Sequence, residues 1–176
     1  NLCGSVHWAF QPISKPVIPE VMNQDWPRNS IDHFILAKLE QQGIPAPKPA
    51  KEAVLKRRIA FDLVGLPPDN TALKNTLHQQ VEALLASPHY GERWGRHWLD
   101  VARYADSNGL DENAAHANAW RYRDYVVQSF NDDKPFNRFL TEQIAGDLLP
   151  DNGNPIQRRT HLIATGFLSM GPKVLA

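Results

Sequence analysis

The sequence predicts an all-α fold, an irregular bundle of about six to seven helices with an extended, proline-rich N-terminal arm. Apolar residues recur at helical spacing, strand-like alternation is nowhere sustained, and glycine and proline punctuate the periodic segments. A chain of 176 residues is long enough for one core. We therefore expect an arm over residues 1–29 and a single helical domain over residues 30–176.

Four prolines favour extended backbone in the arm, because proline is excluded from helix interiors. Trp8, Phe10 and Trp26 are the large side chains that we expect to anchor it. Ser30 is placed to cap the first helix, which is predicted over residues 31–42 and is followed by a glycine.

Further helices follow the linker GIPAPKPAK, and each ends at a glycine, a proline or a polar segment. The segment DSNGLDENAAHAN is predicted to be a polar loop between two of them. The expected helices span residues 51–64, 70–86, 90–105, 120–131, 136–149 and 156–169.

Composition excludes several classes of protein. Nineteen basic and nineteen acidic residues give a net charge of zero, which argues against a nucleic-acid-binding protein. Cys3 is the only cysteine, so the chain can form neither an internal disulfide nor a thiolate-rich metal site. No apolar run is long enough for a membrane span, and the first residues lack the pattern of a signal peptide.

The stretch SPHYGERWGRHWLDVARYAD, residues 87–106, is the densest in charged and aromatic side chains. Placed on a helix, its predicted core face consists of Trp94, Trp98, Val101, Ala102 and Ala105. The opposite face gathers Arg93, Arg96, Asp100, Arg103 and Tyr104, at spacings that suit ion pairs within a helix. His97 lies on the border between the two faces.

A border histidine can act as a general base or ligate a metal, although such residues more often only hydrogen-bond at a core edge. His89 and His97 are eight residues apart, which is not the i, i+4 spacing of a metal pair, so we expect no metal. The candidate catalytic residues are His97, Asp100 and Asp106. The candidate substrate-binding residues are Arg93, Trp94, Arg103, Arg121 and Arg123.

Two charges fall inside predicted apolar faces. Arg123 lies among aromatic and β-branched residues of its helix, and Asp147 lies on the face of Phe136, Leu140 and Ile144. An unpaired buried charge is costly, so each is expected to find a partner: each other, Asp106 or Asp124. Such a pair would either fix the helix register or form part of a binding site.

Two short motifs hint at cofactors. CGSVH, residues 3–7, has the outline of a haem-attachment motif in which Val6 replaces the second cysteine. The loop DSNGLDEN offers Asp106, Asn108, Asp111 and Glu112 as calcium ligands, without the spacing of an EF-hand.

Six blocks occur in a recognisable order: HWAFQPISKPVIP, WPRNSIDHFILAKLE, RRIAFDLVGLPPD, LLASPHYGERWGRHWLDVARYADSNG, NAWRYRDYVVQSFNDDKPFNRFLTEQIAGDLLP and LIATGFLSMGP. Over residues 7–172 the chain thereby resembles the planctomycete cytochrome-c-associated domain family. This is a domain of unknown function found beside c-type cytochrome domains in large exported bacterial proteins. The segment between GLPPD and LLASPHYGERW is shorter here than in most of the family.

The resemblance implies a helical fold, a periplasmic or cell-surface location, and a c-type cytochrome domain of the same polypeptide as partner. Family members continue past GFLSMGPKVLA into a haem-attachment motif. Haem c is therefore expected outside this segment, with His89 and His97 as the candidate ligands within it.

The resemblance also implies a function: a helical module that supports haem-linked electron transfer or oxidative chemistry on an extracellular substrate, expected to be a complex carbohydrate. A second reading is an acid/base hydrolase or lyase module for anionic polysaccharide, in which arginines clamp the anionic groups and Asp106 or His97 transfers the proton. Paired carboxylates in a cleft with tryptophans would favour it. A third is a purely structural assembly domain, favoured by a closed surface near His97.

Overall fold

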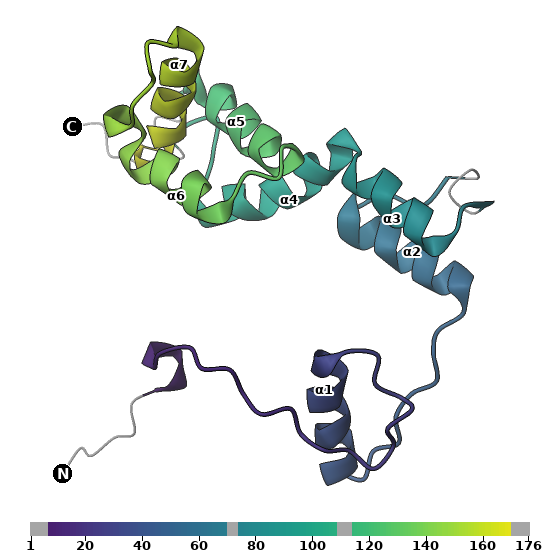
Figure 1. Ribbon diagram of the computed structural model, residues 1–176. Coiled ribbons are helices and arrows are strands. Elements are labelled where there is room, and N and C mark those ends of the chain that lie inside the picture. Colours follow the sequence, from purple (N-terminus) through teal and green to yellow (C-terminus); the bar gives the residue numbers. More distant parts are fainter. Residues whose placement is uncertain (1–6, 70–73, 109–113, 170–176) are drawn as a thin grey trace, which may run out of the picture. The chain divides into compact units, whose positions relative to one another are not determined.

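The computed structural model describes residues 7–69, 74–108 and 114–169. These residues form seven α-helices and short 3₁₀ helices without a β-strand, which confirms the all-α class (Figure 1). The α-helices are α1 (Ser30–Gln41), α2 (Glu52–Leu63), α3 (Leu77–Leu85), α4 (Pro88–Val101), α5 (Ala119–Asn131), α6 (Phe136–Ala145) and α7 (Pro155–Ala164). The 3₁₀ helices include η1 (Trp8–Phe10), η3 (Gly146–Leu148) and η4 (Thr165–Leu168).

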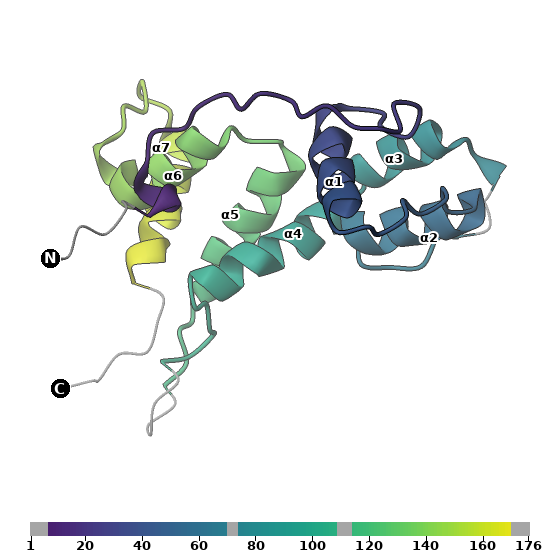
Figure 2. The same ribbon diagram turned by 90° about the horizontal axis from the view of Figure 1, so that it is seen from below.

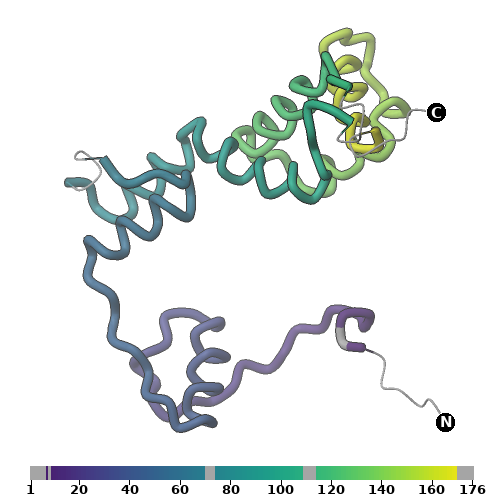
Figure 3. The backbone as a smooth tube through the Cα atoms, turned by 180° about the vertical axis from the view of Figure 1, so that it is seen from behind, coloured from purple at the N-terminus to yellow at the C-terminus, as the bar shows by residue number. Residues whose placement is uncertain are grey.

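The chain forms two compact units, Asn1–Pro49 and Ala50–Ala176. The first contains the N-terminal arm and α1, and the second contains α2 to α7 (Figure 3). The predicted arm and the first predicted helix thus share one unit.

In the first unit, Glu40 of α1 holds the arm. Its carboxylate oxygens accept the backbone N–H of Met22 at 3.0 and 3.1 Å, and one of them accepts that of Asn23 at 3.2 Å. The half-buried Trp26 donates its indole N–H to the carbonyl of Pro47 at 2.9 Å, so it anchors the arm as expected. Phe10 lies in η1 and is 83% exposed within the first unit. The side chain of Trp8, the third expected anchor, lies outside the described part of the structure.

Most helix ends lie close to the predicted ones, since capping residues and prolines act locally. Asn29, rather than Ser30, caps α1, by accepting the backbone N–H of Asp32. Helix α4 stops at Val101, earlier than predicted, and Arg103 just beyond it has a positive φ of 53°. The predicted helix over residues 136–149 divides into α6 and the 3₁₀ helix η3.

The core of the second unit lies between α4, α5, α6 and α7. Its centre is aromatic, and its buried members are Ala102, Tyr122, Tyr125, Val126, Phe139 and Ala164. Trp98 packs against this cluster, edge-on to Phe139 with ring centroids 5.0 Å apart.

Helices α4 and α5 lie side by side and antiparallel (Figure 2). Two buried glycines of α4, Gly91 and Gly95, face Val127 of α5. The side chain of Asn131 accepts the backbone N–H of Gly91 at 2.8 Å and donates to the carbonyl of Pro88 at 3.3 Å. The end of α5 is thereby clamped onto the start of α4.

The predicted core face of α4 is only partly correct. Ala102 is buried and Trp98 is half-buried, but Val101 is 68% exposed and Trp94 is 37% exposed. The glycine face is turned inward instead, because residues without side chains let two helix backbones approach closely.

Candidate functional site

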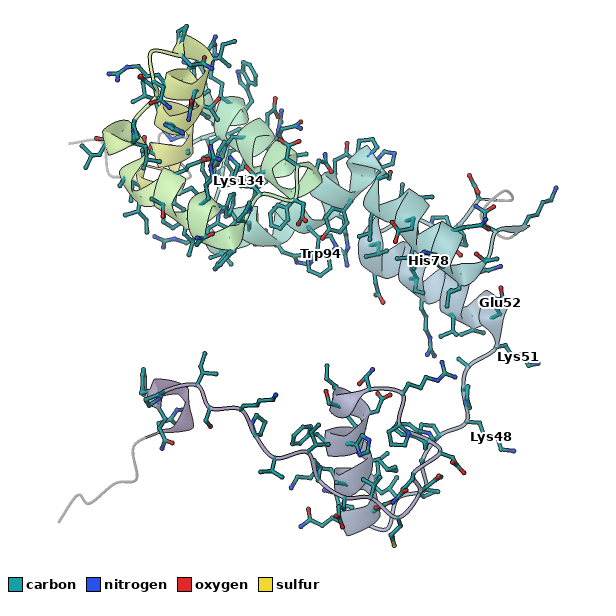
Figure 4. All side chains as sticks on the ribbon, viewed as in Figure 1. Lys48, Lys51, Glu52, His78, Trp94 and Lys134 are labelled. Atoms are coloured by element: carbon teal, nitrogen blue, oxygen red, sulfur yellow. The ribbon has the colours of Figure 1, made fainter. Side chains whose placement is uncertain are left out.

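A groove of about 440 Å³ lies beside α5 and α7 in the second unit, and we call it the α5–α7 groove. Most of its lining comes from α5, the turn after it contributes Asp132 and Lys134, and α7 contributes Arg159, Thr160 and Ile163. Its charged and aromatic lining includes Trp120, Arg121, Asp124, Asp132, Lys134 and Arg159. Lys134, which lines the groove, and Trp94, which lies on α4, are both labelled in Figure 4.

At one end of α5, Arg121 is held by its neighbours. Its guanidinium carbon lies 4.8 Å from the ring centroid of Trp120, within the range of a cation–π contact. Its Nε donates to the side-chain oxygen of Asn118 at 3.0 Å. The indole of Trp120 is still 44% exposed, so an aromatic surface and an oriented cation lie together in the groove.

Two carboxylates share the groove with these groups. Asp124 accepts from Nε and Nη2 of Arg123 at 2.9 and 2.8 Å. Asp132 accepts from the side-chain amide of Gln128 at 2.7 Å. The groove therefore offers both cations and hydrogen-bond acceptors to a ligand.

Beneath the groove lies a buried charge, Glu142 of α6, which is 1% exposed. It accepts from Lys134 Nζ at 2.5 Å, from the hydroxyl of Tyr125 at 2.9 Å and from Arg138 Nε at 2.8 Å. We call these four residues the Glu142 cluster. His161 of α7 lies close by, with Nε2 3.9 Å from Glu142 Oε1.

The contacts within the Glu142 cluster shift the pKa values of Glu142 and Tyr125. Burial acts to raise the pKa of Glu142, but the hydrogen bonds from Lys134, Arg138 and Tyr125 together outweigh it and lower that pKa. Burial and the hydrogen bond to Glu142 raise the pKa of the Tyr125 hydroxyl. Glu142 is therefore an anion, and Tyr125 a neutral donor, at neutral pH.

The stability of the second unit should consequently fall in acid. Because the folded-state pKa of Glu142 is below its unfolded-state value of about 4.3, its contribution is fully present above that pH and is lost as the pH falls through the folded-state pKa. We expect urea unfolding between pH 7 and pH 3 to show a steeper loss in the wild type than in Glu142→Gln. Equal slopes for the two proteins would contradict this.

A buried amide, in addition to the buried carboxylate of Glu142, joins α4, α5 and α6. Gln143, which is fully buried, accepts from the indole N–H of Trp98 at 2.8 Å and from the hydroxyl of Tyr122 at 2.5 Å. Burial raises the pKa of Tyr122 to about 12. These bonds satisfy the polar atoms of a largely aromatic core and fix the position of Trp98.

The predicted site residues on α4 do not form a single site with the groove residues. His97 is exposed. Within the described residues its ring contacts that of Trp94, with the ring centroids 5.5 Å apart. Asp100 is also exposed. The aliphatic part of the Arg93 side chain packs close to Gly65: a Cβ atom added to Gly65 would lie 3.1 Å from Arg93 Cδ. Arg103 is exposed just past the helix.

Besides the contact between Trp94 and His97, the structure pairs the predicted site residue Asp106 with Tyr104. Asp106 accepts from the hydroxyl of Tyr104 at 2.6 Å, and burial with this hydrogen bond raises the pKa of Tyr104 to about 12. The charge of Arg123 acts to lower the pKa of the same hydroxyl.

The predicted burial of Arg123 and Asp147 is wrong. The Arg123 side chain is 46% exposed, although it does pair with one of its expected partners, Asp124. Asp147 is exposed in η3, because the α-helix has already ended at Ala145. The exposed fractions of Phe136 and Ile144, 64% and 60%, show that α6 turns the opposite face to the core.

The sequence carries only part of a haem-attachment motif. One cysteine cannot supply the two thioether bonds of the attachment motif. His89, with Nδ1 2.7 Å from Glu92, and His97 are both exposed, so neither position offers buried apolar surroundings for a porphyrin. Cys3, Val6, Asp111 and Glu112, which belong to the two short cofactor motifs, lie outside the described residues.

Metal ligands are not grouped in the described part of the chain, where no cluster of three or more histidine, cysteine, aspartate or glutamate side chains could hold an ion. Among the described helices, none combines the length and apolar character needed to cross a membrane.

Sequence reasoning missed Lys134, Glu142 and Arg159. The i, i+4 spacing of Arg138 and Glu142 was a signal for an ion pair, but it does not reveal that the carboxylate is buried. In the structure Lys134 also pairs with this carboxylate, and its Nζ lies 4.5 Å from the ring centroid of Tyr125.

Fold and site together define an all-α domain with a polar groove beside two of its helices. Residues 30–174 match the family model PSCyt2, described as a protein of unknown function (DUF1549). Since the match covers most of the chain, the chain belongs to this family. Neither the comparison with curated proteins nor that with solved structures gives a match.

Proposed function

We propose that the chain is the substrate-binding helical module of an exported, cytochrome-c-associated protein, and that the α5–α7 groove binds a saccharide. The family name supports the association with cytochrome c. The neighbouring haem domain would supply the electron transfer or oxidative chemistry, and this module would hold the carbohydrate.

The observation that carries the proposal is the pairing of Trp120 with polar groups in one groove. An exposed indole offers a flat apolar surface to a sugar ring, and Asp124, Asp132 and Gln128 offer hydrogen-bond partners for hydroxyl groups. Binding pockets combine apolar surface with a few placed polar groups in this way.

The carboxylates of the groove do not support hydrolysis of a glycosidic bond in it. Asp124 and Asp132 are eight residues apart on the same wall, a rise of about 12 Å along a helix. Glycosidases need two carboxyl groups about 5–5.5 Å or about 6.5–9.5 Å apart, on either side of the bond. Recognition is thus better supported than hydrolysis.

Substitution of Trp120 tests the proposal. We expect the 176-residue chain to bind an oligosaccharide from a panel of neutral, uronic and sulfated hexasaccharides in calorimetric titrations. Trp120→Ala should weaken that binding about tenfold or more, because the stacking surface is lost.

Trp94→Ala is the matched control, since Trp94 is similarly exposed at 37% but lies on α4. It should leave the affinity unchanged. If no member of the panel binds the wild type, or if only Trp94→Ala weakens binding, the groove is not a saccharide site.

A further inference from the structure

We infer that the saccharide bound in the α5–α7 groove is acidic, and that Arg121 and Arg159 hold its carboxylate or sulfate group. This inference rests on the proposed function and names the ligand class for the same groove. It depends on which cations of the groove remain free to bind an anion.

Arg121 is positioned for such a contact. Its Nε is occupied by Asn118, and its guanidinium plane is held over Trp120. Both terminal nitrogens, Nη1 and Nη2, make no hydrogen bond to any other described residue. A guanidinium held in this way can donate two parallel hydrogen bonds to a carboxylate or a sulfate without first losing much side-chain freedom.

Arg159 adds a second cation from a different helix. It is exposed on α7 and lines the groove. Within the described residues neither Arg121 nor Arg159 has a carboxylate within ion-pair distance. The next residue along the chain, Arg158, differs because it pairs with Asp151 at 3.4 Å and does not line the groove.

The third cation of the groove, Lys134, is already engaged. Its ammonium lies 2.5 Å from Glu142, and the Lys134 side chain is only 15% exposed. A ligand that bound Lys134 would have to break this ion pair, so the anion is expected on the two arginines instead.

The remaining charges favour an acidic saccharide over a polyanion. Asp124 and Asp132 line the same groove and would repel a ligand with closely spaced negative charges, such as an acidic peptide or a nucleic acid. The same oxygens accept hydrogen bonds from sugar hydroxyls. One anionic group among several hydroxyls matches both the arginines and the carboxylates.

Calorimetric titration with three hexasaccharides tests this inference: a neutral glucan, the same glucan with a single uronic acid residue, and the same glucan with a single sulfate group. The wild type should bind one of the two acidic probes at least tenfold more tightly than the neutral probe. Which acidic probe binds distinguishes carboxylate from sulfate recognition. Arg121→Gln and Arg159→Gln should each weaken acidic binding five- to tenfold and reduce the preference for the acidic probe over the neutral one.

Two further variants serve as controls. Arg158→Gln should have no effect on either ligand, since Arg158 is adjacent in sequence but paired elsewhere. Arg121→Lys keeps the charge but not the paired donors, and should fall between wild type and Arg121→Gln.

The results separate the two proposals. Equal affinity for neutral and acidic probes that still depends on Trp120 would overturn the acidic ligand while leaving the saccharide site in place. The same holds if Arg121→Gln and Arg159→Gln behave like Arg158→Gln. Binding of none of the three probes would overturn both.

Discussion

Glu142→Ala is expected to destabilise the second unit by about 3–5 kcal/mol, the loss that follows when one partner of a buried ion pair is removed. The substitution leaves Lys134, at 15% exposure, and the buried hydroxyl of Tyr125 without their acceptor. Urea unfolding followed by tryptophan fluorescence, to which Trp98 at the edge of the core contributes, measures the change.

Two variants show whether the loss comes from the buried partners. Arg138→Ala should cost less than about 1 kcal/mol, because Arg138 contacts the same carboxylate but is 59% exposed. Combining Glu142→Ala with Lys134→Met should recover part of the stability, since no buried ammonium then remains. A loss below about 1 kcal/mol for Glu142→Ala alone would mean that the cluster does not stabilise the fold.

Gly91→Ala should be the other strongly destabilising change, because the new Cβ would meet the backbone of α5. It would lie 2.4 Å from the carbonyl oxygen of Val127 and 2.6 Å from the side chain of Asn131. Overpacking costs about 1–3 kcal/mol and occasionally more, and this contact is with backbone that cannot turn aside. The helix-propensity gain of about 1 kcal/mol for alanine does not offset a cost at the top of that range.

Gly95→Ala provides the comparison on the same face of the same helix. Its Cβ would lie 3.3 Å from a side-chain carbon of Val127, which can move by a few tenths of an ångström. We expect a change within about 1 kcal/mol of zero in urea unfolding, because the small contact cost and the propensity gain are similar. An equal loss for the two variants would show that the close approach at Gly91 is not the cause.

The helices could be predicted from the sequence because their ends depend on local residues. Pro88 and Pro155 sit in the first turn of α4 and α7, close to the predicted starts at residues 90 and 156. Helix α3 begins at Leu77 after the capping box of Thr76, later than the predicted start at residue 70. These signals need no knowledge of the tertiary structure.

The inward face of each helix was harder to predict. In α6 the apolar stripe of Phe136 and Ile144 is exposed, while Glu142 and Gln143 are buried. Periodicity ranks residues by hydropathy, but these two polar residues are buried because Lys134 and Trp98 are available to pair with them. Those partners come from other elements, so they were not visible in the pattern of α6.

The candidate site, too, could be predicted only where it depends on residues that are neighbours in the sequence. The block of residues 118–124 contributes Trp120, Arg121 and Asp124 to the groove, and its combination of arginine and aromatic residues was evident in the sequence. The contribution of Arg159 was not evident, because it depends on where α7 packs against α5.

The glycine contact between α4 and α5 has a mechanical consequence. With Asn131 bonded to the first turn of α4 and no α4 side chain at Gly91 and Gly95 to separate the backbones, we expect the two helices to move as one rigid pair. Helix α5 forms a wall of the α5–α7 groove along its length, and α4 contacts α2 and α3. We therefore expect a ligand that displaces α5 to move α4 with it, and so to shift the contacts of α4 with α2 and α3.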